Sequence, residues 1–175
     1  MKTMWAPGAG AAGDSRVGIR WIFNPYLLLV FRLALAAVFI YAAAQKIGKP
    51  LAFAQEIHNY GVVDYGTPLY IMAVVLPWIE LFCGLALVTG VGVRGAALIL
   101  VGLNAMFLVV IAKKTVAYVS GGTPFMKVYF DCGCGFGATY AWKKLLEDVI
   151  YLLLALALLA APRHRFIVSR KRRSA

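Results

Sequence analysis

The chain has 175 residues, of which 62% are hydrophobic and 14% are charged. An average soluble domain is about 45–50% apolar and about 25% charged, so this composition excludes a soluble enzyme. Eighteen Lys and Arg against seven Asp and Glu give a net charge of +11. Six of those basic residues lie within Arg163–Ala175, directly after an apolar run. Such a tail is typical of a signal that sets the orientation of a membrane protein, so no nucleic-acid partner is expected.

Four segments are apolar enough to cross a bilayer, which needs about 20 such residues in a helix. In chain order they are Tyr26–Ala44, Pro68–Gly90, Gly95–Ala112 and Leu145–Ala161. The sequence therefore predicts an all-α, four-helix transmembrane bundle over residues 26–161. Residues 1–25 are expected to form a flexible N-terminal tail, and residues 162–175 form a basic C-terminal tail.

The distribution of basic residues predicts the orientation of this bundle. The N-terminal segment, the turn between the second and third spans and the C-terminal tail carry ten Lys and Arg, against seven lysines on the opposite face. Because the more basic side is normally cytoplasmic, both termini are expected there, and the segments 45–67 and 113–144 face the periplasm. A cleaved signal peptide is the alternative for the first span, but its apolar run exceeds the usual length of about 7–15 residues.

The two outward segments carry different patterns. In the first, the apolar residues Leu51, Phe53, Ile57 and Tyr60 have the spacing of a short amphipathic helix lying on the bilayer. The second contains seven aromatic residues between positions 118 and 142. Aromatic rings gather at membrane–water boundaries, so this loop is expected to lie along the membrane surface.

A pair of cysteines stands in the second outward segment, in the run Asp131-Cys132-Gly133-Cys134. Two thiols separated by one residue can form a disulfide only through a tight turn, which Gly133 makes accessible. Strain in so small a ring makes the bond easier to reduce. Strained and exposed disulfides are typically catalytic or regulatory, so a redox-active pair is the favoured interpretation.

Two other interpretations of the pair stay open. A metal site lacks ligands, since zinc needs four and only Asp131 and His58 accompany the cysteines on that face. A purely structural disulfide would close too small a loop to stabilise the chain much. The third cysteine, Cys83, is expected to be a small apolar core residue.

Charged residues inside a bilayer usually have a partner or a function. Counted along the predicted spans, Arg32, Asn104 and Glu80 lie about 9, 13 and 15 Å from the inner boundary. We expect them to form one intramembrane polar cluster with an Arg32–Glu80 ion pair. The cluster either holds the helices together or forms the polar base of a cavity for a quinone or for protons. The candidates for tuning or supporting the cysteine loop are Asp131 and Gly133 within it and Lys46 and Asp148 at the outer boundary. Lys46 is the candidate for tuning, because a cation near a thiol lowers its pKa.

These features together resemble the MauE/DoxX family of small bacterial membrane proteins, and its MauE branch in particular. The resemblance runs from Arg32 to Asp148 and includes Lys46, the Phe53–Tyr60 stretch, Glu80 followed by small residues, and the cysteine motif. One departure is Gly135, which stands before Phe136-Gly137 where the family usually reads Cys-Gly-Cys-Phe-Gly.

The resemblance implies a four-helix protein of the bacterial inner membrane. The MauE branch looks like a factor needed for disulfide formation or transport during maturation of the methylamine dehydrogenase light chain. DoxX and DoxD relatives are tied to thiosulfate or thiol oxidation with quinone. The first hypothesis is therefore a thiol–disulfide oxidoreductase in which Cys132 and Cys134 act on a periplasmic client protein or a small thiol. No cofactor is required by the sequence, and a lipid quinone is a candidate.

Two further hypotheses belong to other functional classes. One is a non-enzymatic assembly subunit of a larger membrane complex, with structural cysteines. The other is a protein that handles a soft metal such as Cu(I) through the C-x-C pair. Replacement of both cysteines separates the first hypothesis from the second, and bound metal in the purified protein would indicate the third.

Overall fold

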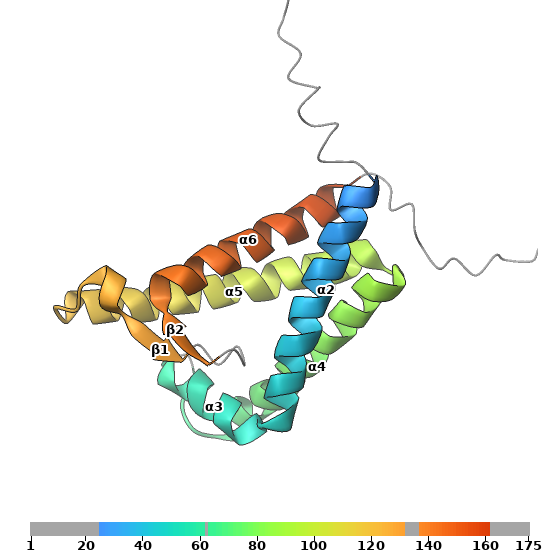
Figure 1. Ribbon diagram of the computed structural model, residues 1–175. Coiled ribbons are helices and arrows are strands. Elements are labelled where there is room, and N and C mark those ends of the chain that lie inside the picture. Colours follow the sequence, from blue (N-terminus) through green and yellow to red (C-terminus); the bar gives the residue numbers. More distant parts are fainter. Residues whose placement is uncertain (1–24, 62, 132–136, 162–175) are drawn as a thin grey trace, which may run out of the picture.

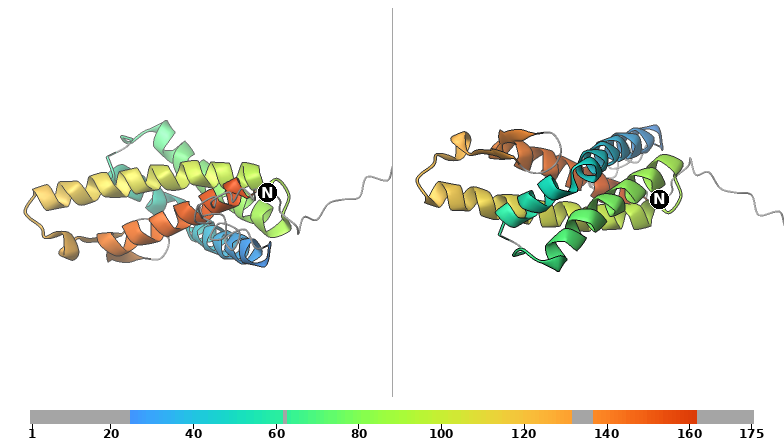
Figure 2. Two further views of the ribbon diagram at one scale, coloured as in Figure 1. Left: turned by 90° about the horizontal axis from the view of Figure 1, so that it is seen from above. Right: turned by 90° about the horizontal axis from the view of Figure 1, so that it is seen from below.

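Four long helices form the framework of the protein, seen in a computed structural model that describes residues 25–61, 63–131 and 137–161 (Figure 1). The helices are α2 (Pro25–Gly48), α4 (Thr67–Thr89), α5 (Val93–Ser120) and α6 (Ala141–Ala160). Helix α2 packs mainly against α4, and α5 packs mainly against α6. The two pairs lie close together near the α4–α5 turn and diverge toward the opposite end (Figures 1 and 2).

Three of these helices, α2, α4 and α5, are long and apolar enough to cross a membrane. This confirms three of the four predicted spans. Helix α6 does not qualify because Lys143, Lys144, Glu147 and Asp148 all lie within its first eight residues. The four-span topology and the cytoplasmic position of the termini stay predictions, and the two predicted tails lie almost wholly outside the described residues.

The predicted amphipathic segment forms helix α3 (Pro50–Asn59). Phe53, Ala54 and Ile57 of this helix are buried in a cluster with Leu69 and Ala73 of α4, while Leu51 is exposed. The apolar face of α3 therefore covers the start of α4, and this contact holds α3 at the wide end of the molecule.

The described part of the second predicted outward segment contains regular secondary structure. Its first residues extend α5 to Ser120, eight residues beyond the predicted end of the span. A 3₁₀ turn, η1 (Phe125–Lys127), leads into the antiparallel hairpin of β1 (Tyr129–Asp131) and β2 (Ala138–Tyr140), in which Phe130 pairs with Thr139. The hairpin extends from the α5–α6 pair toward α3 (Figure 1).

Helices α4 and α5 join through a tight turn that depends on glycine. Gly90 ends α4 with φ 78°, and Gly92 precedes α5 with φ 63°. Both values lie in the left-handed region, which glycine adopts without steric cost. The turn aligns the ends of α4 and α5 beside the main apolar core, which includes Leu35, Leu87, Leu100, Leu158 and, as predicted, Cys83.

Candidate functional site

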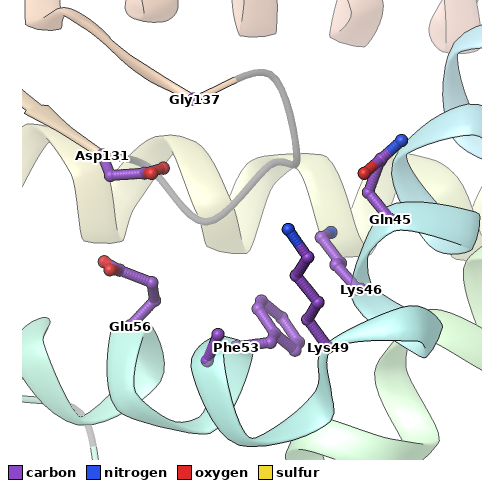
Figure 3. Close-up of a pocket in the computed structure, with 8 residues that line it drawn as sticks. Gln45, Lys46, Lys49, Phe53, Glu56, Asp131 and Gly137 are labelled. Carbon is purple, nitrogen blue, oxygen red and sulfur yellow. The ribbon is translucent and has the colours of Figure 1, made fainter.

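A pocket of about 280 Å³ opens at the wide end of the molecule, between α3 and the hairpin (Figure 3). We call it the hairpin pocket; its lining residues are Gln45, Lys46, Lys49, Ala52, Phe53, Glu56, Asp131 and Gly137. Asp131 and Gly137 are the described residues on either side of the segment 132–136. The predicted redox residues Cys132 and Cys134, together with Gly133, lie outside the described residues.

The walls of the hairpin pocket carry opposite charges. Lys49, from the start of α3, extends toward the hairpin, while Glu56 and Asp131 face each other on the other side (Figure 3). Burial raises the pKa of the Glu56 carboxyl, and the nearby negative charge of Asp131 raises it further, while Lys114 and a hydrogen bond with Asn59 oppose this shift. Glu56 therefore holds a proton at higher pH than an ordinary glutamate does.

Lys46 and Glu80 form a buried ion pair below this pocket. The Lys46 ammonium donates to both carboxylate oxygens of Glu80, at Nζ–Oε1 2.7 Å and Nζ–Oε2 2.8 Å, and the two side chains are 4% and 2% exposed. The Lys46 ammonium also lies about 5 Å from the ring centroids of Phe53 and Phe107. A buried charge is tolerated only when it is paired and hydrogen-bonded in this way.

The expected Arg32–Glu80 pair is wrong, and the register of α2 against α4 explains why. Gly84 of α4 packs against Ala36 and Ile40 of α2. In an antiparallel pair with this register, Arg32 lies level with the end of α4, about 15 Å from Glu80 along the axis. Lys46 lies only about one turn beyond Glu80, and its side chain points back toward the start of α2, because Cβ bonds tilt that way in a helix.

A second buried ion pair lies on α6. The Lys144 ammonium is 2.6 Å from Asp148 Oδ1 and 3.8 Å from Glu147 Oε2, the latter on a half-exposed side chain. Asn104 of α5 donates from Nδ2 to the backbone oxygen of Asp148 at 2.8 Å, which fastens α5 to α6. Lys144 is a site residue that the sequence did not single out, although its spacing of four residues from Asp148 is the spacing of ion pairs along one helix face.

The two ion pairs meet at a small, partly open cavity of about 40 Å³ between α2, α4, α5 and α6, which we call the inner cavity. Its polar lining consists of Lys46, Glu80, Asn104, Lys144 and Asp148, and its remaining lining consists of Val38, Phe39, Ala42, Phe107 and Tyr151. The structure thus brings together four residues that the sequence singled out, Lys46, Glu80, Asn104 and Asp148. Arg32, also buried, is not among the lining residues. Within residues 25–61, 63–131 and 137–161, no group of three or more His, Cys, Asp or Glu could hold a metal ion.

Lys114 connects the hairpin to α3. Its ammonium lies 4.4 Å from the ring centroid of Tyr60, which follows α3, and 4.9 Å from that of Phe130 in β1. The Phe130 ring also stacks on Tyr118 of α5 at 6.0 Å. These contacts fix β1, and with it Asp131, against the pocket wall.

Replacement of Lys114 by methionine is expected to loosen the hairpin. A partly buried cation–π contact stabilises by about 0.5–2 kcal/mol, and methionine removes the charge while keeping an apolar stem. Hydrogen–deuterium exchange should then become faster at the amides of β1. Lys113→Met is the matched control, because Lys113 is exposed and its replacement should leave that exchange unchanged; equal effects of the two variants would contradict the role given to Lys114.

Sequence comparison relates most of the chain to a known protein family. The family model for methylamine utilisation protein MauE matches residues 24–161. A protein from Paracoccus denitrificans named methylamine utilization protein MauE is 28% identical over 142 residues, which cover 79% of this chain and 71% of that protein. No solved structure gives a significant match. Because the family model spans the whole helical framework and both buried ion pairs, the chain belongs to the MauE family of methylamine utilisation proteins.

Proposed function

We propose that this protein is a thiol–disulfide exchange protein of the bacterial inner membrane, with Cys132 and Cys134 on its periplasmic face as the redox pair. The observation that carries the proposal is the position of Asp131 and Gly137. These two residues flank the cysteine segment in the sequence, and both line the hairpin pocket together with Lys46 and Lys49. A pocket with lysines beside a C-x-C segment suits thiolate chemistry, because a nearby cation favours the thiolate.

The exchange step needs no further reagent. A thiolate of a client dithiol attacks one sulfur of the Cys132–Cys134 disulfide, which forms a mixed disulfide and releases the other sulfur as a thiolate. The second client thiolate then attacks the client sulfur of that mixed disulfide and frees the second cysteine. Two electrons and two protons pass from the client to Cys132 and Cys134; with a disulfide client and reduced cysteines, the same steps run in reverse.

The comparison with the Paracoccus denitrificans protein suggests a place for this exchange. That protein is named for methylamine utilisation, and we extend that role to this chain. The client we propose is a periplasmic protein of methylamine utilisation that needs disulfides to mature, such as the light chain of methylamine dehydrogenase.

Replacement of both Cys132 and Cys134 by serine is expected to abolish maturation of the client in cells. The second measurement uses a thiol-alkylating reagent on membranes equilibrated at a series of redox potentials. In the reduced wild type the reagent should label both Cys132 and Cys134, and these two labels should be missing from the double variant. Cys83→Ser is the matched control, because Cys83 is buried among apolar residues and its loss should leave maturation and the two labels intact.

Full maturation in the double variant would overturn the proposal and favour the assembly subunit with structural cysteines. Purified wild type that carries one soft metal ion per chain, lost in the double variant, would instead favour metal handling through the C-x-C pair.

A further inference from the structure

The inner cavity contains a buried carboxylate oxygen that is hydrogen-bonded to no protein group in the described part of the chain. Asp148 Oδ1 accepts from Lys144, whereas Asp148 Oδ2 has no such partner. The side chain of Asp148 is 4% exposed. Buried polar atoms are normally satisfied by protein or by ordered water, so this oxygen calls for a partner such as a bound water.

The size and charge of the inner cavity restrict what that ligand is. A cavity of about 40 Å³ exceeds the roughly 10–15 Å³ needed for one water molecule, and a water takes about 30 Å³ in the liquid, so there is room for one or two. The Lys46–Glu80 and Lys144–Asp148 pairs are each neutral, and the two ammonium groups disfavour a bound cation. Water, which donates to Oδ2 and finds further polar partners on the walls, fits both constraints.

Lys46 links this cavity to the hairpin pocket, since it lines both. The charged groups around Asp148 come from three helices: Lys46 from α2, Glu80 from α4, and Lys144 with Glu147 from α6. Helix α5 contributes the uncharged Asn104. Lys46 thus joins the hairpin pocket to the two buried ion pairs of the inner cavity.

We propose that the inner cavity is a proton-exchange site, in which bound water joins Asp148 to the Lys46–Glu80 pair and Asp148 Oδ2 takes up and releases a proton. Its use rests on the proposed function. In each thiol–disulfide exchange a proton leaves the attacking thiol and a proton is returned to the released thiolate. A site that stores one proton next to the hairpin pocket can accept the proton in the first of these transfers and return it in the second.

The test of the site itself uses the full-length protein in lipid nanodiscs, without any client. Infrared difference spectra between acidic and neutral pH should contain, among the carboxyl C=O bands of the protein, one band that belongs to Asp148. The band should be lost in Asp148→Asn and retained in Glu147→Gln, the matched control on the adjacent half-exposed carboxyl. Absence from the wild type of any band that Asp148→Asn removes, or equal loss of that band in Glu147→Gln, would overturn the proposal.

A second pair of variants keeps every charged group in place. Ala42 is buried and lines the inner cavity, whereas Ala44 is exposed on the same helix. Ala42→Val should occupy the space for water and remove the Asp148 band between these two pH values, whereas Ala44→Val should retain the band; an unchanged band in Ala42→Val would overturn the proposal. Wild-type cysteines that do not exchange with a small disulfide would refute the proposed function alone, because the infrared band does not depend on them.

Discussion

Replacement of Lys46 by methionine is expected to lower the free energy of unfolding by about 3–5 kcal/mol, the usual cost of removing one partner from a buried ion pair. The variant leaves the Glu80 carboxylate in a site where its side chain is 2% exposed and removes the cation that donates to both of its oxygens. Since domains are typically stable by only about 5–15 kcal/mol, this is a large share of the total. Reversible denaturant unfolding in detergent micelles measures the change.

Two further variants isolate the effect of the pair. Lys49→Met removes an exposed lysine three residues away, and it should change stability by less than about 0.5 kcal/mol. Combining Lys46→Met with Glu80→Leu removes both charges, and it should recover most of the lost stability, because a buried pair replaced by apolar residues is often neutral. A Lys46→Met variant as stable as Lys49→Met would contradict the buried pair.

The residues of the buried cluster were predictable from the sequence, but their partners were not. Glu80 and Asn104 stand out because a polar residue within an apolar span requires a partner. The partner of Glu80 depends on how far α2 is shifted along α4, and that shift is set by the contact of Gly84 with Ala36 and Ile40. A count of residues from assumed membrane boundaries does not contain this information, so it paired Glu80 with Arg32 and left Lys46 at the surface.

The outward segments illustrate a second limit of prediction. The amphipathic spacing from Leu51 to Tyr60 correctly predicted helix α3, because periodicity is a local property. The extension of α5 to Ser120 and the hairpin of β1 and β2 depend on contacts between distant segments, such as Lys114 with Phe130. Some of the aromatic residues that predicted a surface loop form contacts within the protein, since Phe130 stacks on Tyr118.

Replacement of Gly84 by alanine is expected to destabilise the α2–α4 pair by about 1–3 kcal/mol, the usual cost of inserting a methyl group into a packed interface. A Cβ atom at this position would lie 2.6 Å from Cγ1 of Ile40 and 3.3 Å from the backbone oxygen of Ala36. The first contact involves a stiff part of a branched side chain and the second involves backbone, so neither neighbour can move easily. Small residues at helix interfaces permit this close approach in membrane proteins.

Gly102→Ala is the matched control for this prediction, since Gly102 is exposed on α5 and a Cβ atom there would meet nothing within 4 Å. It should leave stability unchanged or raise it by up to about 1 kcal/mol, because alanine favours a helix more than glycine does. Adding Ile40→Ala to Gly84→Ala removes the nearer clash, so unfolding measurements should show that the double variant loses less stability than the two single losses combined. Because the position of Glu80 relative to Lys46 depends on the same helix contact, Gly84→Ala should also weaken the buried ion pair. Equal stability of Gly84→Ala and Gly102→Ala would show that α2 and α4 do not approach each other this closely.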